Sequence, residues 1–189
     1  MNNTNRKFIG ILGGTFDPPH DGHVFISRYA ISRLKVDEIW WVVTYKNPLK
    51  QKRTSFDKRV KNVKKYLRGS KIRVLETDNE KNVYTIETIR YLKEKFPAKK
   101  FIWLMGSDNI EKIHLWRNWK DIFYNIPIAI FDRPFYSLNL TKSKALSFFR
   151  KSRIKNNLSK KLKFMTPPKW TFINGLKNHQ SSTSIRKTR

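Results

Sequence analysis

Short apolar runs alternate with helix-like segments along most of the chain, and this alternation limits the folds that it can adopt. The predicted strands are residues 8–12, 38–44, 72–75, 101–105, 126–131 and 169–174. The predicted helices, whose apolar residues recur at helical spacing, are 22–34, 56–67, 85–96, 116–124 and a last one from 181. Parallel strands that are joined through helices place those helices on both faces of one sheet. We therefore predict an α/β protein with a mainly parallel sheet in a three-layer α/β/α arrangement.

Length and composition predict one packed domain. Of the 189 residues, 39% are hydrophobic and 14% aromatic, which suffices for a core and is unlike a disordered chain. No internal repeat and no Gly- or Pro-rich linker divides the sequence, so we expect a single domain over residues 1–189. Residues 141–163 are basic and the least strand-like, and we expect them to form a helical insertion or a lid.

Composition also excludes several classes of protein. The chain contains no cysteine, which rules out disulfides, a thiol nucleophile and thiolate-bound zinc. The longest apolar runs, such as residues 126–131, are far shorter than a membrane span. The apolar stretch near the start runs into glycines instead of a signal-peptide cleavage site. We expect a soluble, cytoplasmic protein without a membrane partner.

The net charge of +27 is unusual and unevenly distributed. Residues 133–189 contain 15 Lys or Arg and no Asp or Glu. Such a field attracts polyanions, which include nucleotides, nucleic acid and anionic lipid. Charge alone does not choose among them.

The most informative segment follows the first predicted strand and reads GGTFDPPHDGH. Gly13 and Gly14 allow a tight turn and the close approach of an anion to backbone N–H groups. His20 and His23 lie three residues apart at a helix start, so both rings can lie on one side. Gly22 leaves space for a phosphate at the helix N-terminus, where the dipole favours anions. The segment predicts a phosphate-binding loop, with a plain turn bearing surface histidines, or a metal-binding pair, as the alternatives.

A second candidate anion site lies near the other end, in the sequence SSTSIR. The hydroxyls of Ser182 and Thr183 can cap a helix, and Arg186 follows one turn later to complete an anion clamp. An ordinary helix cap in a basic tail is the alternative interpretation.

Two further regions follow predicted strands, at the sheet edge where ligands bind in such folds. Thr44, Lys46 and Asn47 come directly after the second strand, and Lys46 or Lys50 could neutralise a phosphate there. A lysine-bearing turn before a helix is the alternative.

The fourth region is split between the segments NVYTIET and MGSDN, the second of which leads to two tryptophans. It contains Thr85, Gly106, Asp108, Trp116 and Trp119. A tryptophan face can support a flat, cationic pyridinium ring. Core packing is the alternative for each tryptophan, and a helix N-cap is the alternative for Asp108.

Together these segments resemble the nucleotidyltransferase superfamily, whose phosphate loop ends in His-x-Gly-His or Thr-x-Gly-His. The form GGTFDPPHDGH looks like that of the bacterial nicotinate-nucleotide adenylyltransferases, and SSTSIR resembles their Ser-Ser-Thr-x-x-Arg motif. YTIET is similar to their Tyr-Thr-x-Asp-Thr stretch with Glu87 in place of Asp, and Phe135 replaces the glycine of their Arg-Pro-Gly turn. The resemblance covers about residues 7–134 and 170–187 and implies a Rossmann-like nucleotidyltransferase fold.

The resemblance implies an enzyme of NAD biosynthesis that transfers AMP from ATP to nicotinate mononucleotide, giving deamido-NAD and pyrophosphate. The catalytic residues that it implies are His20, His23 and Arg186. The implied ATP-binding residues are Gly13, Gly14, Thr15, Phe16, His20, Gly22, His23, Gly106, Asp108, Ser182, Thr183 and Arg186. Those implied for nicotinate mononucleotide are Thr44, Lys46, Asn47, Thr85, Asp108 and Trp116. A Mg²⁺ ion is expected to accompany ATP with few protein ligands.

Two alternatives stay open. The acceptor could instead be nicotinamide mononucleotide or a pantetheine phosphate. In a different class, the basic chain could bind nucleic acid on the same fold, with Phe148, Phe149 and Trp170 as stacking surfaces. Its basic residues follow no recognised nucleic-acid motif, so we favour the enzyme. The sequence leaves the oligomeric state undecided.

Overall fold

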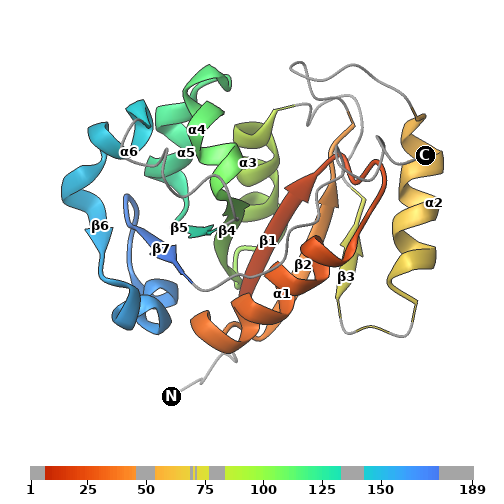
Figure 1. The fold of residues 1–189 in the computed structure, drawn as a ribbon, viewed down its shortest axis with the longest axis horizontal. Coiled ribbons are helices and arrows are strands. Elements are labelled where there is room, and N and C mark those ends of the chain that lie inside the picture. The colour runs from red at the N-terminus through yellow and green to blue at the C-terminus, as the bar shows by residue number, and fades with distance from the viewer. Residues whose placement is uncertain are drawn as a thin grey trace.

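A computed structural model describes residues 7–45, 54–68, 70, 72–76, 84–132 and 143–174 of the chain. Its centre is a seven-stranded sheet in the order β3-β2-β1-β4-β5-β7-β6, in which every neighbouring pair is parallel (Figure 1). The strands are β1 (Phe8–Gly14), β2 (Glu38–Val43), β3 (Arg73–Leu75), β4 (Lys100–Gly106), β5 (Ile128–Phe131), β6 (Arg153–Ile154) and β7 (Trp170–Ile173). The predicted parallel α/β sheet is confirmed.

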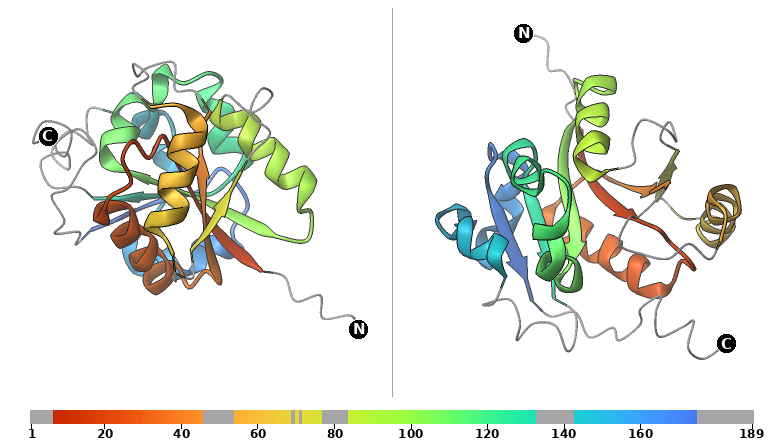
Figure 2. Two further views of the ribbon diagram at one scale, coloured as in Figure 1. Left: turned by 90° about the vertical axis from the view of Figure 1, so that its right-hand side faces the viewer. Right: turned by 90° about the horizontal axis from the view of Figure 1, so that it is seen from above.

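Helices cover both faces of this sheet, as the two further views in Figure 2 show. The α-helices are α1 (Asp21–Leu34), α2 (Phe56–Tyr66), α3 (Thr85–Lys95), α4 (Ser107–Lys112), α5 (Trp119–Asn125) and α6 (Lys144–Phe148). The 3₁₀ helices are η1 (Ile113–Leu115), η3 (Arg150–Ser152) and η4 (Asn156–Phe164). The predicted helix from 181 lies outside the described residues. Among those described, no helix combines the length and the apolar character that crossing a membrane requires.

The buried side chains divide into two clusters, one on each face of the sheet. Ile11 and Trp40 face α3, α4, α5 and α6, whereas Leu12 and Trp41 face α1, α2 and η4. Successive residues of a strand point to opposite faces, so near-continuous apolar runs are what a sheet buried on both sides requires. The three-layer prediction is therefore confirmed.

Two elements begin two or more residues later than predicted, for identifiable reasons. Helix α5 begins at Trp119 and not at Trp116, because Trp116 is extended and Asn118 has a left-handed φ of 50°. Strand β5 begins at Ile128 because Ile126 is the C-cap of α5, and Pro127, which follows it, has no backbone N–H to donate to a ladder.

The basic segment expected to be helical also contributes to the sheet. Besides α6, η3 and η4 it contains β6, whose Arg153 and Ile154 pair with Trp170 and Thr171 of β7. The indole of Trp170 also donates a hydrogen bond of 2.8 Å to the carbonyl of Phe149. This segment therefore packs on the edge of the sheet.

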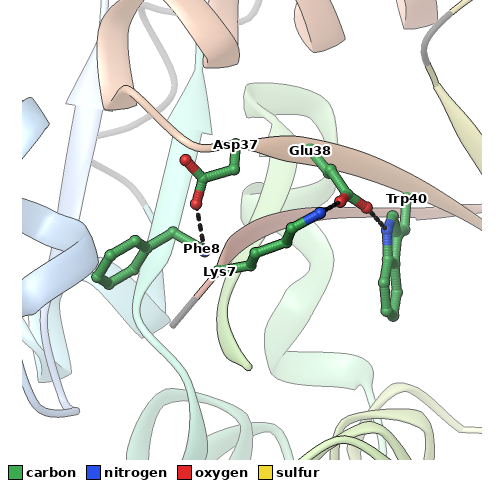
Figure 3. A network of polar contacts seen from close by, with 5 residues as sticks. All are labelled: Lys7, Phe8, Asp37, Glu38 and Trp40. Atoms are coloured by element: carbon green, nitrogen blue, oxygen red, sulfur yellow. Dashed lines mark hydrogen bonds and ion pairs between the residues drawn. The ribbon is translucent and has the colours of Figure 1, made fainter. Parts of the chain in front are cut away.

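Polar contacts fix the amino ends of β1 and β2, at the edge of the sheet where these strands begin (Figure 3). The Lys7 ammonium contacts the Glu38 carboxylate at 2.7 Å, and the other oxygen of that carboxylate accepts a 2.9 Å bond from the Trp40 indole. The Phe8 N–H donates to the Asp37 carboxylate at 2.7 Å. The Lys7 ammonium and the Trp40 indole lower the pKa of Glu38 below its ordinary value.

Candidate functional site

The carboxyl ends of β1, β2, β4 and β5 form one edge of the parallel sheet, and the predicted site segments begin there (Figure 1). β1 lies between β2 and β4, so the loop after β1 is flanked by the loops after both neighbours. The N–H of Thr44, after β2, donates a 2.9 Å hydrogen bond to the carbonyl of Gly14, at the end of β1. The topology therefore brings the phosphate loop and Thr44 together.

The histidines of the loop lie against each other, with ring centroids 3.8 Å apart. His20 is the N-cap of α1, and its Nδ1 accepts the Gly22 N–H at 3.1 Å. The Nδ1 of His23 accepts the His20 N–H at 3.3 Å. An imidazole nitrogen that accepts a hydrogen bond carries no proton, so each neutral ring holds its proton on Nε2. Both rings are thereby set to donate from Nε2.

Two aromatic rings support this pair. Phe16 stacks on Trp41 with centroids 4.6 Å apart and an interplanar angle of 7°, and it lies 4.7 Å from the His23 ring. The Trp41 indole donates a 2.8 Å bond to the Ser27 hydroxyl, which donates in turn to the His23 carbonyl at 2.8 Å. Phe16 is only 1% exposed, so its ring is a buried support for the histidines. Trp41 has this supporting position although the sequence suggested only a strand residue.

Gly13 and Gly14 are the last two residues of β1 and do not form the predicted tight turn, but packing leaves no room for a side chain at Gly13. A Cβ on Gly13 would lie 2.6 Å from the Trp103 ring, closer than atoms can approach without a shift of the structure. Phe16 adopts a left-handed φ of 46°, which is uncommon for a residue with a side chain. Close packing beneath Gly13 and the unusual backbone of Phe16 together shape this loop.

Asp108 and Gly106 lie where β4 ends and α4 begins. Gly106 is the last residue of β4 and the N-cap of α4, and Asp108 lies within the first turn of that helix, half-buried. The N-cap alternative for Asp108 is therefore wrong. Because β4 neighbours β1, Asp108 lies at the same sheet edge as the histidine loop.

The structure brings the Trp116 segment to the start of α3, where Thr85 is the first residue. The guanidinium of Arg117 lies 4.8 Å from the centroid of the Tyr84 ring, which joins the two segments. Glu87 accepts the Tyr84 N–H at 3.1 Å and thereby caps the helix.

The two tryptophans differ in their surroundings. Trp116 is partly buried against the core cluster on this face of the sheet. Trp119 packs edge-on against Phe148, Phe149 and Phe123, with centroids 5.8, 6.1 and 6.4 Å away. These contacts support the core interpretation for Trp119.

Several predicted site residues lie outside the described residues. They are Lys46, Asn47, Ser182, Thr183 and Arg186, together with Lys50 and Phe135.

Arg59 is a polar residue at this edge that the sequence analysis did not single out. It is 3% exposed although it carries a guanidinium. One signal was present: Arg59 lies three residues after Phe56 and four before Val63, on the apolar stripe of α2. Burial lowers the pKa of Arg59 from its ordinary value.

The described residues offer no group of three or more His, Cys, Asp or Glu side chains that could hold a metal ion. A Mg²⁺ ion that arrives with a nucleotide needs no such cage, since it takes most of its ligands from phosphate and water.

Comparison with known proteins shows a family relationship over nearly the whole chain. The cytidylyltransferase-like family model matches residues 11–188. A probable nicotinate-nucleotide adenylyltransferase of Ruegeria sp. (strain TM1040) is 38% identical, over 95% of this chain and 96% of that protein. One of Brucella suis biovar 1 (strain 1330), with the same description, is also 38% identical, over 95% and 94%.

Solved structures support the fold. The nicotinic acid mononucleotide adenylyltransferase of Plasmodium falciparum, complexed with NaAD, has a TM-score of 0.74 at 23% identity. The same enzyme complexed with APC has a TM-score of 0.69 at 22% identity. Both likenesses cover 96% of this chain and 83% of the other.

Proposed function

Because the chain belongs to the cytidylyltransferase-like family and, within it, to the nicotinate-nucleotide adenylyltransferases, we propose that it transfers AMP from ATP to nicotinate mononucleotide. An oxygen of the mononucleotide 5′-phosphate attacks the α-phosphorus of ATP, and the bond from that phosphorus to the bridging oxygen of pyrophosphate breaks. The products are deamido-NAD, a precursor of NAD, and pyrophosphate. The reaction consumes ATP, which agrees with the cytoplasmic location expected from the sequence.

The observation that carries the proposed mechanism is the His20–His23 pair at the N-terminus of α1. Each ring accepts a backbone N–H at its Nδ1, so the neutral ring carries its proton on Nε2. We assign these donors to the α- and β-phosphates, where negative charge shifts onto the leaving pyrophosphate in the transition state. The backbone N–H groups of Gly14 to Phe16 complete this path.

The chain has to bring two anionic substrates together against their mutual repulsion. Positioning and charge neutralisation supply most of the catalysis in phosphoryl transfer, and correct placement alone can supply on the order of 7–11 kcal/mol. We assign Arg186, with Ser182 and Thr183, to the β- and γ-phosphates by the motif that they form. A Mg²⁺ ion bound to the triphosphate would supply further charge neutralisation.

The acceptor site is proposed at the start of α3 and the segment before α5. Trp116 would support the nicotinate ring, while Thr85 and nearby backbone N–H groups would bind its carboxylate. The Arg117–Tyr84 contact supports this pairing because it holds the two segments together. Asp108 would bind a ribose hydroxyl, and Thr44, Lys46 and Asn47 would help to seat the mononucleotide.

The proposal is tested by comparing acceptors. Pyrophosphate release is measured with purified protein, MgATP and, in separate reactions, nicotinate mononucleotide, nicotinamide mononucleotide or phosphopantetheine. The expected kcat/KM is highest with nicotinate mononucleotide. A higher value with either other acceptor would contradict the assigned substrate, and salt-sensitive RNA binding without any pyrophosphate release would favour the nucleic-acid alternative.

A further inference from the structure

One guanidinium holds the backbone of the histidine loop and of the loop after β2. Arg59 Nη1 donates to the carbonyl of Thr15 at 2.9 Å and to the carbonyl of Thr44 at 2.8 Å. Its Nη2 donates to the carbonyl of Tyr45 at 2.9 Å, and its Nε to that of Thr54 at 3.3 Å. The four acceptors come from the loop after β1, the loop after β2 and the approach to α2.

Burying the Arg59 guanidinium costs free energy, which its hydrogen bonds to these carbonyls must offset. A buried charge is unfavourable unless its hydrogen bonds are made, and Arg59 is 3% exposed. A guanidinium presents its donors in a rigid planar fork, so it can bind carbonyls from several segments at once. Lysine carries the same charge on a single nitrogen and cannot span these acceptors.

The carbonyls that Arg59 binds set the direction of neighbouring N–H groups. In a trans peptide the C=O of one residue and the N–H of the next point in opposite directions. The Thr15 carbonyl is held by Arg59, so the Phe16 N–H points away from the guanidinium. The Thr44 carbonyl is held in the same way, so the Tyr45 N–H also points away from the guanidinium.

We propose that Arg59 is a positioning residue of the adenylyl-transfer site, which holds the carbonyls after β1 and β2 away from the bound phosphates and leaves the adjoining N–H groups to face them. A carbonyl oxygen carries partial negative charge and would repel a polyphosphate, whereas an N–H attracts it. This role rests on the proposed function, and it differs from that of a catalytic residue because Arg59 acts through the backbone of Thr15 and Thr44.

A second contact holds the helix that carries Arg59. The Tyr66 hydroxyl, at the end of α2, hydrogen-bonds the Asp21 carboxylate in the first turn of α1. Burial and this carboxylate raise the pKa of Tyr66 above its ordinary value, so the phenol stays protonated and remains a donor. Arg59 and Tyr66 thus attach α2 to both ends of the segment that contains the histidine loop.

The test compares Arg59→Lys and Arg59→Met with Lys58→Met, a control that removes an exposed charge from the adjacent position on α2. Circular dichroism and the melting temperature identify the folded variants, and kcat and KM are measured for both substrates. Both Arg59 variants should lose at least about tenfold in kcat/KM for ATP, and Lys58→Met should stay within twofold of wild type. A folded Arg59→Lys enzyme within twofold of wild type would overturn the proposal, since charge alone would then suffice.

A measurement on the unaltered chain keeps the proposal testable if the Arg59 variants do not fold. The backbone amide resonances of Phe16 and Tyr45 are followed by NMR while α,β-methylene-ATP is added. At least one should shift clearly more than the Lys58 amide, and no shift of either at saturation would overturn the proposal. The readout needs no turnover, so an absence of adenylyl transfer by the wild type would count against the proposed function alone.

Discussion

The His20 and His23 rings lie 3.8 Å apart, and the two residues cap their own helix: the His20 N–H donates to His23 Nδ1, and His20 Nδ1 accepts from Gly22. The same hydrogen bonds that begin α1 therefore fix which nitrogen of each neutral ring carries the proton. Local structure and proposed chemistry use opposite sides of the imidazole.

The different roles of Nδ1 and Nε2 predict different effects for two substitutions of His23. The amide of Gln can place a donor near the position of Nε2, whereas Asn can replace only the Nδ1 side. His23→Asn should lower kcat by at least about 100-fold, as expected for the loss of one transition-state donor, and His23→Gln should retain more activity. Steady-state kinetics with both substrates at saturation measure this.

Equal loss in the two His23 variants would contradict the Nε2 assignment. A near-normal kcat in His23→Asn would remove the proposed phosphate role altogether. The melting temperature of each variant serves as the control for folding.

Substitution of Trp116 should affect substrate binding, whereas substitution of Trp119 should affect the stability of the fold. Trp116→Ala should raise the KM for nicotinate mononucleotide far more than that for ATP, because its face is the proposed ring platform. Trp119→Ala should instead lower the free energy of unfolding by about 2 kcal/mol or more, since Trp119 packs on three phenylalanines. Kinetics and denaturant unfolding of both variants check this, and equal KM changes for both substrates in Trp116→Ala would identify it as a core residue.

The packing of Gly13 on Trp103 can be tested by adding a methyl group. Gly13→Ala would place a Cβ 2.6 Å from the Trp103 ring, so it should destabilise the fold by about 1–3 kcal/mol. Trp103→Leu in the same chain should recover part of that loss, because the clash would be relieved. The free energies of unfolding of the two single variants and the double variant give the coupling, and strictly additive effects would contradict the contact.

The Lys7–Glu38–Trp40 network predicts a pH dependence of stability. Because the pKa of Glu38 is lowered in the folded chain, its contribution is complete above the unfolded pKa, near 4.5. It is lost as the pH falls through the lower folded value. The pair is partly exposed, with side-chain exposures of 48% for Lys7 and 29% for Glu38, so its effect on the free energy of unfolding should be small.

The check is the difference in the free energy of unfolding between wild type and Glu38→Gln across the acid range. The wild type should be more stable at pH 6, and the difference should shrink below pH 4.5 as the wild-type carboxylate becomes protonated. A difference that does not vary with pH would show that Glu38 contributes through its shape and not through its charge.

The parallel sheet and its covering helices could be predicted from the sequence, because apolar runs mark buried strands and helical periodicity marks the helices that cover them. It missed β6 because Arg153 and Ile154 form no apolar run; their pairing depends on β7, which follows later in the chain. The start of α5 was misplaced because the left-handed backbone of Asn118 depends on its surroundings.

Part of the candidate site could also be predicted from the sequence. The spacing of His20 and His23 sufficed to predict that their rings share one side, as they do. The supporting position of Trp41 was not predicted, because its stack on Phe16 joins β2 to the loop after β1 and such a contact has no sequence pattern. Arg59 was missed because three of its four carbonyl acceptors belong to loops distant in sequence.

The central claim is that the protein transfers AMP from ATP to nicotinate mononucleotide. Its most direct test uses ATP that is radioactively labelled at the α-phosphorus and follows that label into the products. Purified protein is incubated with this ATP, Mg²⁺ and nicotinate mononucleotide, and the products are separated. We predict that the label appears in deamido-NAD, in equal amount to the pyrophosphate released and only when nicotinate mononucleotide is present. Label that remains in ATP, or that appears as free AMP without dinucleotide, would contradict the account.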